Sequence, residues 1–270
     1  MSATERHNVT ESGRPDGPAM VFAHGFGCDQ NMWRFVAPAF EDRFRVILFD
    51  HAGAGGSTPD AYDIARHGSL EGYAQDVVEL GRELGVTDGV FVGHSVSAMI
   101  GVLADLHAPE LFARLVLVGP SARYIDDEGY VGGFTESDIR ELLDSLDSNY
   151  LGWSSVMAPT IMGNPDRPAL GEELTESFCR TDPEIASRFA RVTFMSDNRA
   201  DLPRVTTPAL VLQCTQDAIA PTEVGQYVAD TMPNAELVML DATGHCPNLS
   251  APEATIAAMN RFLDGATVGR

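Results

Sequence analysis

Short apolar runs alternate with amphipathic stretches along most of this 270-residue chain. The apolar runs are continuous in Val, Ile, Leu and Phe, which is typical of strands that helices cover on both faces of a sheet. Six strands are expected, at Ala19–Ala23, Arg45–Asp50, Gly89–Gly93, Leu115–Gly119, Ala209–Cys214 and Glu236–Leu240. Helices are expected between them, at Leu70–Leu84, Ser97–Leu106, Thr222–Thr231 and Pro252–Leu263. The order of these elements predicts an α/β fold with a mostly parallel central sheet flanked by helices.

The alternation stops over residues 121–204. Strand signals are lacking in this stretch, and several helical segments are separated by Gly and Pro. One of them starts at Thr135, because Asp138 follows three positions later and can complete a capping box. We therefore expect a core domain made of residues 1–120 and 205–270, into which 121–204 is inserted as a helical lid. Ligands of open α/β sheets bind at the carboxyl edge of the strands, and the lid would cover that edge.

The chain is strongly acidic, with 39 Asp and Glu residues against 18 basic residues and a formal net charge of −21. An acidic surface repels phosphate backbones and anionic membranes, so we expect no nucleic-acid partner and no membrane association. All the basic residues are Arg. Without Lys, neither Schiff-base chemistry nor a phosphate loop that needs a Lys is available.

Cofactor and targeting signals are lacking in the sequence. The four cysteines, Cys28, Cys179, Cys214 and Cys246, do not follow the spacing of a zinc site, and we expect no metal and no organic cofactor. Residues 1–20 lack the apolar core of a signal peptide, and no run approaches the roughly 20 apolar residues of a membrane span. These features predict a cytoplasmic protein.

The strongest local motif is Gly93-His94-Ser95-Val96-Ser97, where an expected strand runs directly into an expected helix. A turn of this kind holds a serine nucleophile in a strained conformation, with its hydroxyl above the sheet. The usual pattern is G-x-S-x-G, and here Ser97 takes the last position as another small residue. Ser95 is therefore the candidate nucleophile. The alternative is an ordinary strand-to-helix turn with a capping serine.

The acid and the base that such a nucleophile needs follow later in the chain, in the order Ser, Asp, His. Asp217 and His245 each lie just after an expected strand, so both belong to the catalytic edge. The only other His after Ser95 is His107, deep in the following helix. We expect His245 to take the proton of Ser95 and Asp217 to hold the imidazole in the required tautomer.

A tetrahedral intermediate also needs donors for its oxyanion. The main-chain N–H of Val96, directly after the nucleophile, is the first candidate. The second is the N–H of Phe26, in the small-residue turn His24–Gly27 that follows the first central strand.

Other features receive a plain structural interpretation. Gly53–Gly56 is expected to be a loop rather than a dinucleotide site, because Pro59 prevents an immediate helix. His7 and His67 are expected at the surface. About half of the aromatic residues in the lid segment are expected to face a pocket. These residues are Tyr124, Phe134, Trp153, Phe178, Phe189 and Phe194.

Several tracts together resemble the RsbQ-like α/β-hydrolases, relatives of a bacterial stress-response regulator and of the plant strigolactone and karrikin receptors. The resemblance covers nearly the whole chain. It rests on the tracts Gly93–Met99, His24–Gln30, Leu212–Cys214, Gly244–Pro247, Phe134–Ile139 and Gly152–Trp153. It implies an α/β-hydrolase fold, a V-shaped four-helix lid over a deep apolar pocket, and a triad of Ser95, His245 and Asp217. The pocket residues it implies are Phe26, Phe134, Trp153, Phe194 and Ile219.

The resemblance also implies an activity, namely slow hydrolysis of a small hydrophobic ester, lactone or enol ether. The alternative is a signalling regulator that senses a small hydrophobic molecule and activates a partner such as a PAS-domain phosphatase in the general stress response. The chain differs from the family at Ser57 and in its acidic surface. These differences affect the surface that would bind a partner protein and not the catalytic chemistry. Ser95 argues against haloalkane dehalogenases and epoxide hydrolases, whose nucleophile is Asp, whereas C–C bond cleavage by a serine enzyme stays open.

Overall fold

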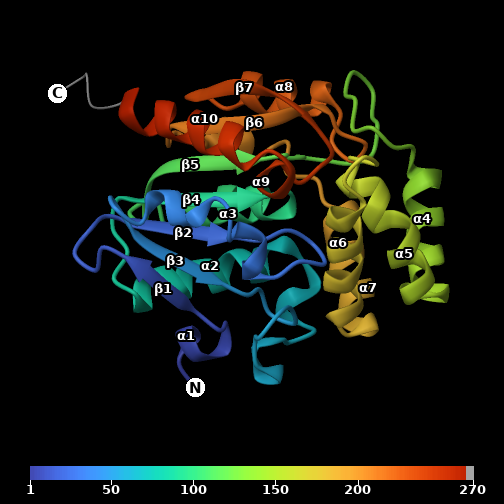
Figure 1. The fold of residues 1–270 in the computed structure, drawn as a ribbon, viewed down its shortest axis with the longest axis horizontal. Helices are drawn as coiled ribbons and strands as arrows, with labels where there is room; N and C mark the ends of the chain where they lie inside the picture. The colour runs from blue at the N-terminus through green and yellow to red at the C-terminus, as the bar shows by residue number, and fades with distance from the viewer. Residues whose placement is uncertain (266–270) are drawn as a thin grey trace.

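A seven-stranded sheet runs through the molecule in the order β1-β3-β2-β4-β5-β6-β7 (Figure 1). The computed structural model describes residues 1–265. Neighbouring strands are parallel except at one edge, where β1 runs antiparallel to β3 with Thr10 opposite Leu48. The strands are β1 (Thr10–Gly13), β2 (Ala19–Ala23), β3 (Arg45–Phe49), β4 (Gly89–His94), β5 (Phe112–Val118), β6 (Ala209–Gln216) and β7 (Ala235–Thr243). The predicted α/β-hydrolase fold, with its mostly parallel sheet, is confirmed.

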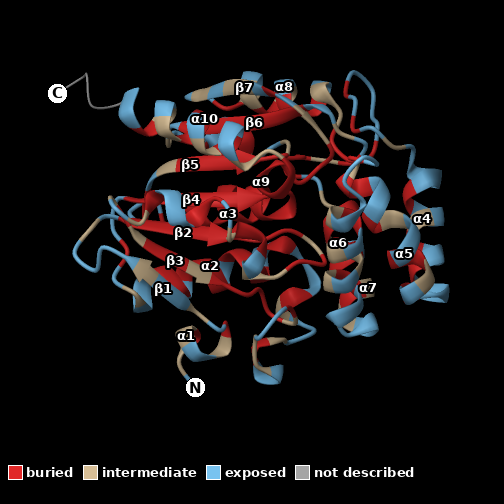
Figure 2. Cartoon of the chain, in the orientation of Figure 1, coloured by how far each residue is buried: buried red, intermediate tan, exposed pale blue. Residues whose placement is uncertain are grey.

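The central strands of the sheet are buried on both faces because their side chains alternate between two apolar clusters (Figure 2). Met20 and Phe22 of β2 belong to one cluster, together with α10 (Pro252–Gly265). Val21 and Ala23 belong to the other. That second cluster includes residues of α2 (Leu70–Glu83), α3 (Val96–His107) and α8 (Thr222–Thr231). Two short helices complete the core, α1 (Ala3–Arg6) and α9 (Pro247–Ser250).

Four helices are inserted between β5 and β6, and they lie together at the end of the sheet toward which the parallel strands run (Figure 1). These inserted helices are α4 (Glu136–Ser148), α5 (Tyr150–Met162), α6 (Pro168–Arg180) and α7 (Pro183–Phe194). Thr135 and Asp138 form a capping box at the start of α4. Asp182 caps α7, and its carboxylate accepts from the N–H groups of Glu184 and Ile185.

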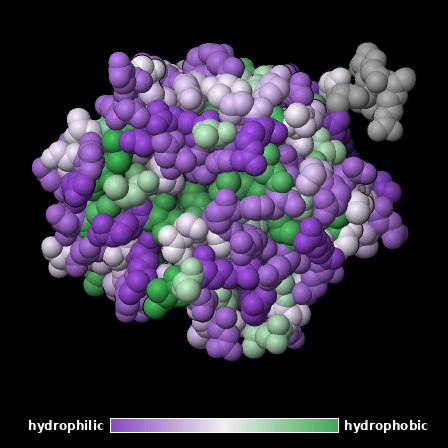
Figure 3. Space-filling view, turned by 180° about the vertical axis from the view of Figure 1, so that it is seen from behind, coloured by the Kyte–Doolittle hydropathy of each residue, from purple (hydrophilic) through white to green (hydrophobic). Residues whose placement is uncertain are grey.

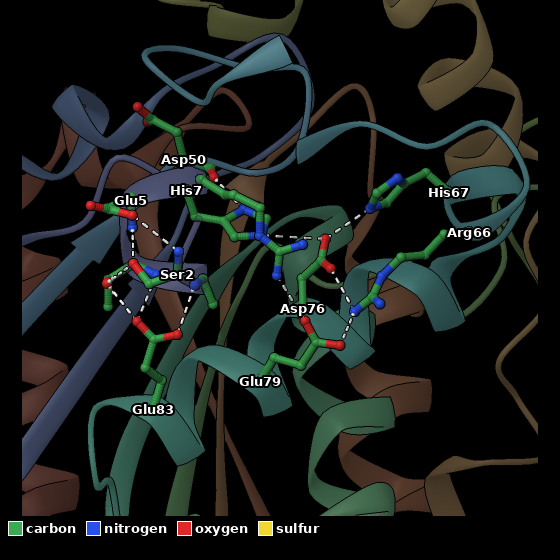
Figure 4. A network of polar contacts seen from close by, with 12 residues as sticks. Ser2, Glu5, His7, Asp50, Arg66, His67, Asp76, Glu79 and Glu83 are labelled. Carbon is green, nitrogen blue, oxygen red and sulfur yellow. Dashed lines mark hydrogen bonds and ion pairs between the residues drawn. The ribbon is translucent and has the colours of Figure 1, made fainter. Parts of the chain in front are cut away.

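The prediction that His7 and His67 lie at the surface is wrong, because both are buried around Asp76 of α2 (Figure 4). The Nε2 atom of His67 lies 2.8 Å from a carboxylate oxygen of Asp76, and Arg66 pairs with the other oxygen at 2.8 Å. Burial lowers the pKa of His7, so its ring stays neutral. Paired polar groups of this kind are tolerated in a core, but the sequence does not show that the partner is Asp76.

The face turned away in Figure 1 is mostly hydrophilic, with smaller hydrophobic areas among the polar side chains (Figure 3). This surface fits the excess of acidic residues in the chain. No helix within residues 1–265 combines the length and the apolar composition that a membrane crossing requires.

Candidate active site

Ser95 lies at the junction of β4 and α3 with a backbone φ of 57° and ψ of −123°. A positive φ is strained for a residue with a side chain, and the surrounding contacts must hold it in place. Two glycines make room for the turn. A Cβ at Gly93 would lie 2.4 Å from the carbonyl oxygen of Ser97, and one at Gly25 would lie 2.5 Å from Nδ1 of His94. The chain therefore passes unusually close to the candidate nucleophile.

The structure brings together Ser95, His245 and Asp217, which come from three separate strand ends. The Oγ atom of Ser95 lies 2.7 Å from Nε2 of His245, and Nδ1 of His245 lies 2.7 Å from a carboxylate oxygen of Asp217. With a proton on Nδ1, the imidazole donates to Asp217 and accepts from the serine hydroxyl. All three side chains are nearly inaccessible to solvent.

Asp217 is held as a carboxylate despite its burial. Burial by itself raises the pKa of Asp217, but the charge and hydrogen bond of His245 oppose this rise, and two main-chain N–H groups add to their effect. These N–H groups belong to Ile219 and Ala220 and lie 2.8 and 3.1 Å from the second carboxylate oxygen. The net pKa of Asp217 lies below its ordinary value, so the group carries the charge that an imidazolium needs beside it.

His94 supports the main chain beneath the base. Its Nε2 atom lies 2.8 Å from the carbonyl oxygen of His245. Burial and the neighbouring His245 lower the pKa of His94 to about 3, so this imidazole stays neutral and donates to that carbonyl. His94 thereby helps to fix the position of the base.

Phe26 lines the same cavity as Ser95, and Val96 follows Ser95 directly in the chain. Within residues 1–265, neither of their main-chain N–H groups donates to a protein acceptor. Val96 is the first residue of α3, where an N–H group has no partner inside the helix. Both groups are therefore free to bind an oxyanion.

A closed set of hydrogen bonds supports the turn that carries Phe26. The Ser97 hydroxyl donates to the carbonyl oxygen of His24 at 2.5 Å. It accepts from Nε2 of His51 at 2.7 Å, and the main-chain N–H of His51 donates to the His24 ring at 3.0 Å. The serine that replaces the usual glycine of the elbow thus ties the elbow helix to the turn. The spacing of the motif does not indicate this role.

A small cavity of about 30 Å³ opens beside Ser95. The predicted pocket residues Phe26, Phe194 and Ile219 line it. No Arg, Asp or Glu is among the residues that line it, all of which lie in the described part of the chain. They are Phe26, Cys28, His94, Ser95, Tyr124, Ile161, Leu174, Phe178, Thr193, Phe194, Ile219, His245 and Cys246.

Two of the predicted pocket residues, Trp153 and Phe134, do not line this cavity. The Trp153 indole packs against two residues that do line it, because it stacks on the ring of Phe178 at 5.8 Å and meets that of Phe26 edge to face at 6.2 Å. Phe134 packs against the apolar core outside the cavity, and its main-chain N–H donates to the carbonyl of Tyr124. Which aromatic rings line the cavity depends on how the inserted helices pack against each other, and the sequence does not show this packing.

The sequence does not indicate that Thr193, Cys28 and Cys246 line the cavity. Burial raises the pKa of Cys28 to about 12 and that of Cys246 well above its ordinary value. Both thiols therefore stay protonated and act as apolar wall rather than as nucleophiles. Within the described residues, no group of three or more His, Cys, Asp or Glu side chains is placed to hold a metal ion.

Comparison with known proteins gives one consistent result. The model of the alpha/beta hydrolase family matches residues 20–258. The chain is 38% identical over 260 residues to a probable esterase of Oryza sativa subsp. japonica, with 96% of each chain covered. It is also 38% identical over 260 residues to the Karrikin insensitive 2 receptor CA of Petunia hybrida, again with 96% of each covered. A solved hydrolase from Oleispira antarctica superposes with a TM-score of 0.94 at 39% identity, over 97% of this chain and 96% of that one.

Proposed function

This chain belongs to the alpha/beta hydrolase family, and from that premise we propose that it is a serine hydrolase acting through Ser95, His245 and Asp217. Its substrate is a small, uncharged, hydrophobic ester, lactone or enol ether. The observation that carries the proposal is the continuous set of hydrogen bonds from Ser95 to His245 to Asp217. Ser95 and His245 also line a mostly apolar cavity, in which a substrate could reach the serine hydroxyl.

The first half of the reaction forms an acyl-enzyme. His245 takes the hydroxyl proton as Ser95 Oγ attacks the substrate carbonyl, and Asp217 stabilises the resulting imidazolium. The carbonyl oxygen becomes an oxyanion that the N–H groups of Phe26 and Val96 bind. The tetrahedral intermediate then collapses, and His245 gives its proton to the leaving oxygen.

The second half releases the acyl group. A water molecule loses its proton to His245 and attacks the acyl carbonyl, and the second intermediate expels Ser95 Oγ, which regains the proton. No metal ion and no organic cofactor is needed, because the protein supplies the nucleophile, the base and the oxyanion donors.

We further propose that residues 121–204 act as a lid. Tyr124, Ile161, Leu174 and Phe194 come from this segment and form part of the cavity wall, together with residues of the core. An apolar wall excludes water, which strengthens each hydrogen bond to the oxyanion. It also disfavours charged substrates, since the cavity wall offers no charged partner.

A second candidate function is a ligand sensor, favoured by the similarity to a karrikin receptor. In this role the same cavity binds a small hydrophobic molecule and the inserted helices engage a protein, for which a PAS-domain phosphatase is our proposal on the basis of resemblance alone. Rapid turnover of small esters supports the first candidate. Tight ligand binding with slow turnover, and a partner that binds only the liganded protein, supports the second.

The experiment is a panel of para-nitrophenyl esters of increasing acyl length, assayed with wild type, Ser95→Ala and the control Ser155→Ala. Ser155 is exposed on α5 and bonds only within its own helix. We expect Ser95→Ala to lose hydrolysis by about 10³-fold or more and Ser155→Ala to retain it. Dialysis against a chelator leaves the wild-type rate unchanged. Equal rates for wild type and Ser95→Ala reject the proposal.

A further inference from the structure

One hydroxyl group of a residue that lines the cavity has no hydrogen-bond partner within the described part of the chain. It is Oγ1 of Thr193, a residue that is only 1% exposed. The hydroxyl of Tyr124, another residue that lines the cavity, interacts with the Ser95 hydroxyl alone. A buried polar group without a partner is unfavourable, and such groups are rare in native proteins. The unpaired hydroxyl of Thr193 therefore calls for an explanation.

Thr193 differs from several other hydroxyl residues of the helices. Their hydroxyls donate to the carbonyl oxygen four residues earlier, which satisfies them locally. The residues that do so are Ser148, Ser154, Ser155, Thr160, Thr175, Ser250 and Thr255. Thr193 lies in the last turn of α7 and makes no such bond, and its side chain is part of the cavity wall instead. Its hydroxyl is therefore available to a molecule inside the cavity.

Tyr124 offers a second donor close to the reacting atoms. Burial raises the pKa of Tyr124 to about 12, and a hydrogen bond with the Ser95 hydroxyl partly opposes this rise. The phenol is therefore protonated at neutral pH. Its ring meets that of Phe194 edge to face at 5.0 Å, and both residues line the cavity together with Thr193.

We infer that the substrate carries, besides its scissile carbonyl, a second uncharged oxygen that accepts a hydrogen bond from Thr193, with Tyr124 as a further donor in the same cavity. This inference rests on the proposed function, which it narrows. The substrate class is a lactone or small ester with an ether, carbonyl or hydroxyl oxygen, rather than a purely hydrocarbon ester. A charged group is excluded, because the cavity wall holds no Arg, Asp or Glu within the described residues. The oxygen accepts from the Thr193 hydroxyl, which the free protein leaves unpaired.

The test uses two pairs of substrates in which one CH₂ group is replaced by oxygen. They are para-nitrophenyl butyrate with para-nitrophenyl methoxyacetate, and δ-valerolactone with para-dioxanone. For each pair we measure the ratio of kcat/KM for the oxygen-containing member to that for the all-carbon member. The difference in intrinsic reactivity cancels when this ratio is compared between a variant and wild type.

Thr193→Val removes the hydroxyl and keeps the shape of the side chain. We expect it to lower the ratio about 3–10-fold in at least one pair, and Tyr124→Phe to act in the same direction. The control is Thr255→Val, because Thr255 is equally buried but bonds to Ala251 and does not line the cavity. It leaves both ratios unchanged. A ratio within twofold of wild type in both pairs for Thr193→Val overturns the inference and assigns the hydroxyl to water or to packing.

Two further measurements distinguish a failure of this inference from a failure of the proposed hydrolase function. If Thr193 is unpaired in the free protein, Thr193→Val leaves the melting temperature unchanged or raises it, whereas a structural hydroxyl lowers it when removed. The Kd ratio of the two lactones is measured in the Ser95→Ala background, where no turnover occurs. A ratio that depends on Thr193 in that background supports the inference even if hydrolysis fails. Normal hydrolysis without any dependence on Thr193 rejects the inference alone.

Discussion

The hydroxyl of Ser97 donates to the main-chain carbonyl of His24 across 2.5 Å, which joins the helix after the nucleophile to the turn that carries Phe26. We expect Ser97→Ala to break this link and let the Phe26 N–H drift from the oxyanion position. The result is a fall in kcat of about tenfold with little change in KM, because the lost interaction is made mainly in the transition state. Steady-state kinetics check this prediction. A change in KM alone contradicts the positioning role.

Asp217 is expected to act through His245 rather than on the substrate. Asp217→Asn removes the charge that stabilises the imidazolium and the acceptor that selects its tautomer. We expect kcat to fall by about 10²–10⁴-fold. The control is Asp241→Asn, a neighbouring exposed carboxylate on β7 that should leave kcat unchanged. If Asp241→Asn has the larger effect, the acid has been misassigned.

Phe194 and Trp153 are both aromatic residues of the inserted helices, but they should respond differently to truncation. Phe194 lines the cavity, so Phe194→Ala should raise KM for hydrophobic esters. Trp153 does not line the cavity and stacks on Phe178, so Trp153→Ala should lower the free energy of unfolding by about 3–5 kcal/mol. Trp153→Phe should restore most of that stability and leave KM near wild type. A large KM effect in Trp153→Phe would place the indole at the substrate.

Asp105 gives a prediction for pH and stability. Burial raises the pKa of Asp105 to about 6, and a hydrogen bond from Thr207 partly opposes this. Between the unfolded value of about 3.9 and this raised value, the folded state binds more protons than the unfolded state, so stability falls as the pH rises through that window.

Asp105→Asn keeps an acceptor for Thr207 without the charge. With allowance for solvent screening, it should stabilise the protein by roughly 1–2 kcal/mol at pH 7.5 and have almost no effect at pH 4. Chemical denaturation at the two pH values measures this difference. The exposed Asp16→Asn serves as the control. A gain that is equal at both pH values contradicts a raised pKa of Asp105.

Much of the fold could be predicted from local sequence patterns. The bounds of β2 and α8 agree with the prediction, because apolar runs and turn residues mark their ends. The edge strand β1 was missed, since Thr-Glu-Ser-Gly has no apolar residue and its place depends on pairing with β3. Ser95, Asp217 and His245 each follow a strand in the sequence. Their proximity could therefore be predicted, because parallel strands end at one edge of the sheet.

The parts that could not be predicted depend on contacts between distant segments. The sequence around His67 does not show that this side chain is buried or that its ring pairs with the buried Asp76. Which ring faces the cavity, Phe178 or Trp153, depends on how the inserted helices pack together. In the sequence, Thr193 does not differ from any other helical threonine. Only the structure shows that its hydroxyl lacks a hydrogen-bond partner within the described residues.

The most direct test of the proposed triad is covalent labelling of the nucleophile. The protein is treated with phenylmethylsulfonyl fluoride, and intact mass and peptide mapping identify the modified residue. The control Ser155→Ala should be labelled like wild type, and His245→Ala should be labelled far more slowly because Ser95 loses its base. We expect a single label on Ser95, none in Ser95→Ala, and loss of ester hydrolysis in proportion to labelling. A label on another residue, or hydrolysis that survives complete modification of Ser95, would contradict it.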